Sequence, residues 1–415
     1  MLDLPRLPVF GWSSFAGPRR SALPSILDRD DVLLTTSGRA AIALALRALD
    51  IGPGDRVLVP TYHCPTMIAP VVALGALPVF FPIDGSGAPA LDLRSAAWDT
   101  PARAMIAAHY FGLPQPMANV RAFCDARGIA LIEDCAHALF GRSGERDVGR
   151  WGDYAIASLT KFLPVVDGGC LAANAGREQV PALARQSRIV QLRSAANAIE
   201  LGMKHRRLPG LNAPLRWIFA GVAASRGNRL AHSDEEARFG TEEHAEGAAA
   251  GSDPTRRWLA DFLPAAKFTS CASAWTRLIA RHAHRERIVA LRRRNYALLA
   301  SRVTGLPGVR AICAEPPADA APYVFPLWVD EPERIYQRVR KEGIPVFRWD
   351  EVWPSCPDLE GDRGKLWSTH VFQLGCHQDL SLEDVERIAS ALAGILADAD
   401  RRTSRSWSDL TPAFR

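Results

Sequence analysis

Residues 129–137 read Ile-Ala-Leu-Ile-Glu-Asp-Cys-Ala-His, an apolar run that ends in two acidic side chains. A short apolar run of this kind is typical of a strand that is buried on both faces. The preceding residues 117–127 have the pattern of a helix, and residues 153–158 indicate another strand. Asp134 would therefore follow the end of a strand predicted at 129–133. A carboxylate there could keep a pyridinium nitrogen protonated, or merely cap the next helix.

Short apolar strands and helices alternate from residue 31 to about residue 180. Helices are also predicted at 39–49 and 65–74, and strands at 56–59, 77–81, 104–108 and 170–173. This alternation predicts an α/β fold with a mostly parallel sheet that is covered by helices on both faces. In such sheets ligands bind beyond the carboxyl ends of the strands, where Asp134 is expected.

The C-terminal part of the chain predicts a smaller α/β unit. Residues 272–299 have a helical pattern and could bridge two domains. After them, strands are predicted at 323–329, 344–349 and 370–374, with helices at 332–342 and 382–397. Ser381 is a good N-cap for the last helix, and Asp384 follows three residues later.

We therefore predict a large domain over residues 1–265, followed by a linking helix and a small domain over residues 266–415. Residues 181–265 have no readable pattern and are interpreted as a divergent insertion or interface region. Within it, residues 217–219 suggest a packing or subunit-contact helix, and residues 240–253 suggest a polar loop.

The composition is that of a globular protein, with 48% hydrophobic and 23% charged residues. The net charge of +5 is small for 415 residues, and without a basic stripe we predict no nucleic-acid partner. Residues 67–83 form the longest run without a polar side chain. Prolines and Gly75 interrupt this run, so we expect a buried helix, a turn and a strand instead of a membrane span.

The eight cysteines are widely spaced and form none of the close pairs that zinc or thiol redox sites use. We therefore predict no metal site. The first residues include Asp3 and Arg6 and lack the apolar core of a signal peptide. Free thiols without an export signal predict a cytoplasmic protein.

Residues 36–41, Thr-Ser-Gly-Arg-Ala-Ala, lie at a predicted helix N-terminus. Free amides and the helix dipole there can bind an anion, and Gly38 lets a phosphate approach the backbone. Helix capping by Ser37 would explain the same residues without any ligand.

Residues 158–161, Ser-Leu-Thr-Lys, follow a predicted strand. A lysine in a partly desolvated site loses its proton easily enough to form an imine, and Ser158 could donate to a phosphate. The alternatives are a solvated surface lysine, or a serine nucleophile of the Ser-x-x-Lys class, whose partner motifs are missing here. A tight turn is expected at residues 167–169, Asp-Gly-Gly, behind Lys161.

In their order and spacing these motifs resemble the DegT/DnrJ/StrS family of sugar aminotransferases, which depend on pyridoxal phosphate (PLP). In chain order the matching segments are 37–41 (Ser-Gly-Arg-Ala-Ala), 52–55 (Gly-Pro-Gly-Asp), 59–60 (Val-Pro), 75–80 (Gly-Ala-Leu-Pro-Val-Phe), 109–114 (His-Tyr-Phe-Gly-Leu-Pro), 132–137 (Ile-Glu-Asp-Cys-Ala-His), and Lys161 with 168–169 (Gly-Gly). The match is dense over residues 31–175, thin in the middle, and recovers at 380–396. The resemblance implies the fold-type-I architecture of PLP-dependent transferases, with a sheet of the seven-stranded type and a small C-terminal α/β domain.

The resemblance also implies PLP as the cofactor and a role for each matching residue. Lys161 would hold the cofactor covalently and move a proton during the reaction, and Asp134 would pair with the ring nitrogen. Ser158 and the amides of residues 38–40 would hold the phosphate. The full set of candidate site residues is Ser37, Gly38, Arg39, Ala40, His63, Cys64, His109, Asp134, His137, Ser158 and Lys161.

Several positions depart from the family pattern. Arg39 stands where the family has threonine, and its charge could still bind phosphate. His137 stands where a glutamine meets the phenolic oxygen of the cofactor, and a neutral histidine can donate there. The aromatic residue that stacks on the ring aligns with Cys64, so His63 or Tyr62 could take that role, or His63 could be purely structural. Ser158 lies two residues closer to the lysine than the phosphate serine of the family.

The resulting hypothesis is a homodimeric aminotransferase that moves an amino group from an amino acid such as glutamate to a nucleotide-linked keto sugar. The substrate class comes from the resemblance alone, and segment 202–206 lacks the asparagine that the family borrows from the neighbouring subunit. One alternative is a PLP enzyme of another reaction type, such as elimination or dehydration, although the dehydratases of the family replace the lysine with histidine. The others are a non-catalytic regulator that binds PLP, and an accidental resemblance.

Overall fold

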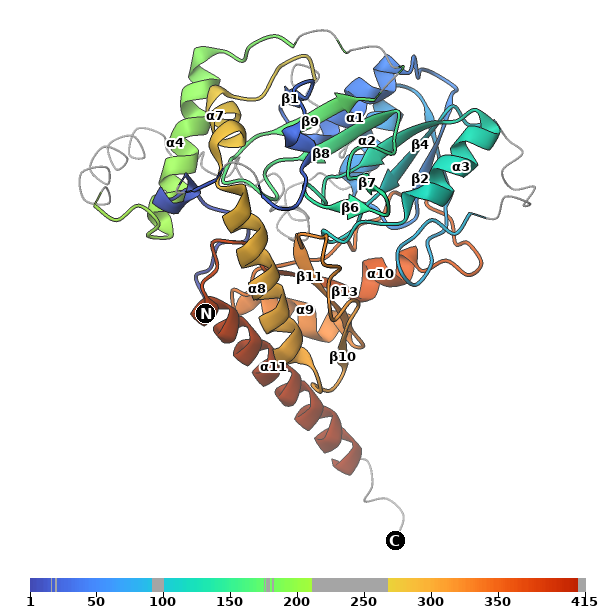
Figure 1. The fold of residues 1–415 in the computed structure, drawn as a ribbon. Coiled ribbons are helices and arrows are strands. Elements are labelled where there is room, and N and C mark those ends of the chain that lie inside the picture. The colour runs from blue at the N-terminus through green and yellow to red at the C-terminus, as the bar shows by residue number, and fades with distance from the viewer. Residues whose placement is uncertain are drawn as a thin grey trace, which may run out of the picture.

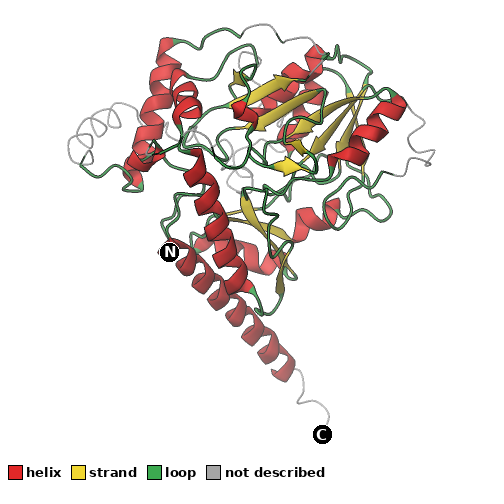
Figure 2. Cartoon of the chain, in the orientation of Figure 1, coloured by secondary structure: helices red, strands yellow, loops and turns green. Residues whose placement is uncertain are grey.

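The computed structural model describes residues 1–409 except 16, 19–20, 92–100, 175, 177–179, 181–182 and 211–267. Its described residues form a seven-stranded sheet, a four-stranded sheet and a two-stranded ribbon, β6 (Arg142–Ser143) with β7 (Arg146–Asp147). Figure 1 shows the large sheet in the upper part of the molecule and the small sheet below it. The helices lie around these sheets (Figure 2).

The large sheet is mostly parallel, as the sequence predicts. Its strands, in the spatial order β1-β9-β8-β5-β4-β2-β3, are β1 (Leu33–Thr35), β9 (Gly169–Ala173), β8 (Tyr154–Ser158), β5 (Ala130–Asp134), β4 (Ala104–Ala108), β2 (Arg56–Pro60) and β3 (Leu77–Phe81). All neighbours from β3 to β8 pair in parallel, whereas β9 is antiparallel to both β8 and β1. The carboxyl ends of β5 and β8, at Asp134 and Ser158, therefore lie at the same edge of the sheet.

Every residue of β4, β5 and β8 is buried, which explains why these strands are mostly apolar, apart from Glu133 and Asp134 in β5 and Ser158 in β8. The helices that follow the first strands are α1 (Gly38–Ala48), α2 (Pro65–Ala73) and α3 (Met117–Arg127). Each has a local signal at one end. The side chain of Ser37 caps α1, Pro65 occupies the first turn of α2, and α3 ends at Gly128 in the left-handed conformation.

Gly169 allows the N-terminus of α1 to approach β9. A Cβ atom at this position would lie 2.3 Å from the carbonyl carbon of Ser37 and 2.6 Å from the amide nitrogen of Gly38, closer than real Cβ contacts. Gly168 has a φ of 135° and donates its N–H to the carbonyl of Thr36 over 2.7 Å. The predicted Asp-Gly-Gly turn is therefore a junction that only glycine permits.

Asp167 connects the same turn to two helices, α4 (Arg188–Lys204) and α7 (Ala274–His282). Its carboxylate accepts hydrogen bonds from the hydroxyl groups of Ser194 (2.9 Å), Ser273 (2.8 Å) and Thr276 (2.6 Å). The backbone N–H of Ser273 also donates to it over 2.9 Å. The segment after the candidate lysine is thus anchored from outside the sheet.

The second unit is built on an antiparallel sheet in the order β10-β11-β13-β12. Its elements are α8 (Arg285–Val303), β10 (Val309–Ala311), β11 (Val324–Val329), α9 (Pro332–Lys341), β12 (Val346–Phe347), α10 (Gly364–His370), β13 (Val371–Gly375) and α11 (Leu382–Asp409). Helices α8 and α11 lie side by side, and α8 runs from the large sheet toward the small one (Figure 1). Leu2 and Leu4 pack against the core of this second unit.

Some sequence predictions are corrected by the structure. The single helix predicted at 272–299 is wrong, because the backbone at Ala283 is extended and separates α7 from α8. The strand predicted at 344–349 is reduced to β12, and α4 lies in a stretch that had no readable pattern. The cap of the last helix is confirmed, since the backbone N–H groups of Ser381 and Asp384 each donate to the other side chain.

The predicted helix at 217–219, the predicted loop at 240–253 and the domain boundary at 265 lie outside the described residues. Among the helices that the structure describes, none is long and apolar enough to cross a membrane.

Candidate active site

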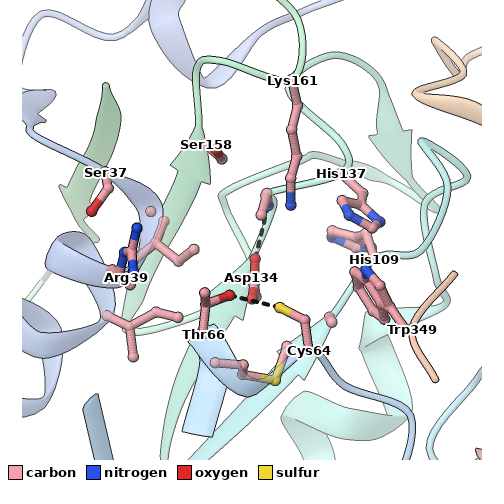
Figure 3. A pocket seen from close by; sticks show the side chains of 16 residues that line it. Ser37, Arg39, Cys64, Thr66, His109, Asp134, His137, Ser158, Lys161 and Trp349 are labelled. Atoms are coloured by element: carbon pink, nitrogen blue, oxygen red, sulfur yellow. Dashed lines mark hydrogen bonds between the residues drawn. The ribbon is translucent and has the colours of Figure 1, made fainter. Parts of the chain in front are cut away.

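The candidate residues converge on one pocket at the carboxyl ends of β5 and β8 (Figure 3). The pocket has a volume of about 520 Å³, counting the space open to solvent. It is lined by Ser37, Gly38, Arg39, Ile42, Cys64, Thr66, Met67, Ala108, His109, Asp134, Ala136, His137, Ile156, Ser158, Lys161 and Trp349. All the predicted site residues except Ala40 and His63 are in this set.

Lys161 reaches into the pocket from the turn after β8 (Figure 3). Its backbone carbonyl accepts a hydrogen bond from the guanidinium of Arg292 over 2.7 Å. Arg292 is fully buried and also donates to the carbonyl oxygens of Pro322 and Tyr323 and to the side chain of Gln378. The Nζ atom of Lys161 lies 5.6 Å from the centre of the Tyr323 ring. Arg292 therefore ties the backbone of the lysine to the segment that leads into β11.

Asp134 is the last residue of β5, whereas the sequence predicts it directly after the end of the strand. Its side chain is directed toward Lys161 (Figure 3). Burial raises the pKa of its carboxyl group, while the N–H of Ala136, 2.8 Å from Oδ1, and the charge of Lys161 act in the opposite direction. A cationic partner stabilises the charged form of a buried carboxylate. Asp134 is thus suited to pair with a protonated ring nitrogen.

His137 has a defined tautomer. The backbone N–H of Phe111 donates to its Nδ1 over 3.3 Å, so the proton of the neutral ring is on Nε2. Burial and the charge of Lys161 lower the pKa of His137 well below its usual range. The ring packs against those of Tyr323 and Trp349, with centroid distances of 4.5 and 4.9 Å. His137 is therefore a neutral side chain with a hydrogen-bond donor at Nε2.

The end of the pocket next to α1 combines hydroxyl groups, a glycine and a cation. Ser37, Arg39 and Ser158 lie there together (Figure 3). The Oγ atom of Ser37 accepts the N–H of Ala40 over 3.2 Å, so the hydroxyl proton can be donated to a ligand, whereas the Ala40 amide already has a partner. A Cβ atom at Gly38 would lie 3.4 Å from the Cβ of Ser158 and would narrow this end. The geometry supports an anion site there, but not the predicted contact through Ala40.

His109 supports the pocket wall through both ring nitrogens. Its Nδ1 accepts the N–H of Gln115 (2.8 Å), and its Nε2 donates to Glu133 (3.0 Å). Glu133 also accepts three backbone N–H groups from residues 149–152, and the thiol of Cys135 lies 3.7 Å from it. His109, Glu133 and Cys135 are metal-binding residue types in one cluster. Because these hydrogen bonds already occupy His109 and Glu133, the cluster is best described as structural.

The residues predicted for ring stacking have other contacts. Cys64 lines the pocket, where its Sγ lies 2.7 Å from the hydroxyl of Thr66, and burial raises the pKa of its thiol. His63 is fully buried, donates from Nδ1 to the carbonyl of Pro60 (3.0 Å), and accepts the N–H of Trp353 at Nε2 (2.9 Å). Burial lowers the pKa of His63 to about 4. This geometry favours the structural alternative for His63 over the stacking role.

Sequence reasoning missed two aromatic residues near the lysine, Tyr323 and Trp349. A second pocket of about 470 Å³ adjoins the first and is lined by Leu7, Cys64, Thr66, His137, Lys161, Tyr323, Phe347, Arg348, Trp349 and Gln373. The aromatic residues come from the second unit, and no local motif marks them. Only the packing of that unit against the large sheet brings them to the site.

A model of the DegT/DnrJ/EryC1/StrS aminotransferase family matches residues 21–237. The match covers more than half of the 415 residues, and the chain belongs to this family. The family match therefore confirms the resemblance that the motifs indicate.

Two curated relatives match a shorter part of the chain. UDP-N-acetyl-3-dehydro-alpha-D-glucosamine 3-aminotransferase from Acidithiobacillus ferrooxidans is 37% identical over 145 residues, which are 34% of this chain and 39% of that protein. GDP-perosamine synthase from Vibrio cholerae is 32% identical over 142 residues, which are 34% of this chain and 39% of that protein. The chain thus spans about two fifths of the length of these relatives.

The likeness in fold extends over nearly the whole chain. The crystal structure of the aminotransferase TlmJ from Streptoalloteichus hindustanus aligns with a TM-score of 0.56 and 18% identity, and the alignment covers 89% of this chain and 87% of that one. At this identity the comparison establishes the fold alone, which is the fold-type-I architecture expected from the motifs.

Proposed function

We propose that this protein is a PLP-dependent aminotransferase that uses an amino acid such as glutamate as donor and a nucleotide-linked keto sugar as acceptor. The observation that carries the proposal is that an amine (Lys161), a buried carboxylate (Asp134) and an anion site formed by residues 37–39 and 158 face one pocket. Each of these groups alone has an ordinary structural explanation. Together they match the three chemically distinct parts of PLP, namely its aldehyde, its ring nitrogen and its phosphate.

The chemical types of the residues fit this cofactor. Ser37 has a hydroxyl proton to donate, Arg39 adds a positive charge, and the absence of a side chain at Gly38 leaves room beside Ser158. At the other side of the pocket, the Nε2–H of His137 can donate to a phenolic oxygen. The arginine at position 39 strengthens the anion site, because guanidinium and phosphate form charge-assisted hydrogen bonds.

When bound, PLP supplies an electron sink for charge that develops at the α-carbon of an amino acid. Asp134 would keep the ring nitrogen protonated through its carboxylate. The amine of Lys161 would carry a proton between the donor's α-carbon and the cofactor. Arg292 fixes the backbone of Lys161 through a hydrogen bond to its carbonyl, and the rings of Tyr323 and Trp349 line the pocket around the lysine.

The substrate class is proposed from the family and the relatives. The names of the relatives contain two different nucleotides, UDP and GDP, so the proposal specifies a nucleotide-linked keto sugar without a particular nucleotide. A homodimer and a cytoplasmic location belong to the same proposal. The size of the oligomer can be measured by light scattering of the purified chain.

An absorbance experiment tests the proposal. PLP is added to the purified protein, and the spectrum is recorded before and after L-glutamate for the parent, for Lys161→Ala and for Lys341→Ala. Lys341 serves as the matched control because it is exposed at the end of α9, away from the pocket. We expect a band near the visible edge in the parent and in Lys341→Ala, bleached by glutamate, and no such band in Lys161→Ala.

Absence of the band in the parent protein would refute the PLP proposal. A band that depends on Lys161 but is unchanged by glutamate and by other amino donors would refute transamination and would favour another PLP reaction or a regulatory role.

A further inference from the structure

Among the described residues that line the first pocket, the large-sheet unit contributes no Phe, Tyr or Trp side chain. Cys64 occupies the position that aligns with the stacking aromatic residue of the family, and a thiol has no π face to offer. Neither His63 nor Tyr62 can replace it, because both side chains are fully buried and line neither pocket. An aromatic ring is nevertheless present beside Cys64, and it belongs to Trp349 (Figure 3).

Trp349 is one of the residues that line both pockets, together with Cys64 and Lys161. Its ring lies 4.9 Å from the ring of His137 and 4.9 Å from that of Tyr62, measured between centroids. The side chain is half-buried, so these rings support it while part of it remains exposed toward the pocket.

The segment that carries Trp349 is anchored on both sides. Arg348 before it is buried and forms ion pairs with Glu333 and, over 3.8 Å, with Asp350. Trp353 after it donates its backbone N–H to His63 at the end of β2. These contacts hold the ring over the edge of the large sheet, at the side of the pocket where Cys64 lies.

We propose that Trp349 supplies the aromatic face that contacts the cofactor ring in this chain, in place of the residue that Cys64 replaces. The inference rests on the proposed function, because it presupposes that PLP occupies the first pocket. An aromatic contact of this kind is offset-stacked or tilted, and it increases affinity beyond the burial of area alone. A residue of the second unit would then take part in cofactor binding.

The test is a titration of the full-length protein with PLP, in which the dissociation constant is obtained from the Lys161-dependent absorbance band. We expect Trp349→Leu, which removes the π face and keeps an apolar side chain, to weaken PLP binding about tenfold. Trp367→Leu is the matched control. Trp367 contacts Tyr62 in the same aromatic cluster but lines neither pocket, so its replacement should change the dissociation constant less than about threefold while lowering the unfolding temperature.

A rescue variant distinguishes loss of the aromatic contact from destabilisation of the second unit as the cause of weaker PLP binding. Cys64→Phe added to Trp349→Leu places an aromatic side chain at the neighbouring position of the pocket wall and should restore most of the lost affinity. Unchanged or tighter binding by Trp349→Leu would overturn the inference, and so would a loss that Cys64→Phe leaves fully in place. Either result with a normal lysine-dependent band in the parent would leave the proposed function intact, whereas a parent without the band would refute that function itself.

Discussion

The two sides of the candidate pocket are built in different ways. On the side of the large sheet, Asp134 ends one parallel strand and Lys161 follows its neighbour, and the carboxylate of Asp134 is held by a backbone group only two residues away. On the opposite side, Trp349 is held by contacts that cross most of the chain, such as the bond between Trp353 and His63. The first side can therefore be encoded by short motifs, whereas the second depends on how two units pack.

The largest effect is expected from Gly169→Ala, which would break the sheet side of the pocket. The added Cβ would lie 2.3 Å from the carbonyl carbon of Ser37, so the N-terminus of α1 and strand β9 would have to move apart. We expect a loss of about 3 kcal/mol in the free energy of unfolding, measured with urea. Gly394→Ala is the control, because a Cβ there meets no heavy atom within 4 Å in the exposed part of α11, and it should stabilise by about 0.5–1 kcal/mol. A loss below about 0.5 kcal/mol at position 169 would contradict the close approach.

Asp134→Asn should affect chemistry without affecting the fold. Asparagine keeps an oxygen for the N–H of Ala136 but cannot hold a proton on a ring nitrogen. We expect the rate of amino-group transfer to fall about a hundredfold. Burial raises the pKa of the Asp134 carboxyl, so removing this buried charge should leave the stability of the cofactor-free protein unchanged or higher. A rate within about threefold of the parent would show that Asp134 has no electrostatic role.

The smallest expected effect is on the pH dependence of stability, and it concerns His63, which accepts the N–H of Trp353 from the opposite side of the pocket. Burial lowers the pKa of His63 to about 4, so between pH 6.5 and 4 the unfolded chain binds a proton that the folded chain does not. His63 should therefore contribute a fall in the free energy of unfolding of up to about 1.4 kcal/mol for each pH unit of decrease, and His63→Gln should remove this contribution from the slope. Urea unfolding at pH 7 and pH 5 measures both slopes. Equal slopes for the parent and the variant would mean that His63 does not couple protonation to folding.

The sequence was informative where structure depends on nearest neighbours. Strands β2 to β5, helices α1 to α3 and the cap at Ser381 and Asp384 follow from apolar periodicity and end signals. The predictions were weaker where tertiary contacts decide. The continuous helix at 272–299 was wrong, because the apolar pattern does not report the extended backbone at Ala283. Helix α4 was missed because only three of its residues are buried, so its sequence has no pronounced apolar face.

The sequence by itself determined the class of fold and the types of group at the candidate site, because lysine, aspartate and glycine follow strands in a fixed order. Only the tertiary structure decided which of these groups share a pocket, that His137 presents Nε2 and that His63 is turned toward Trp353. It also brought Trp349 next to Cys64. The physical reason is that hydrogen bonds and ring contacts between residues hundreds of positions apart produce no periodic pattern in the local sequence.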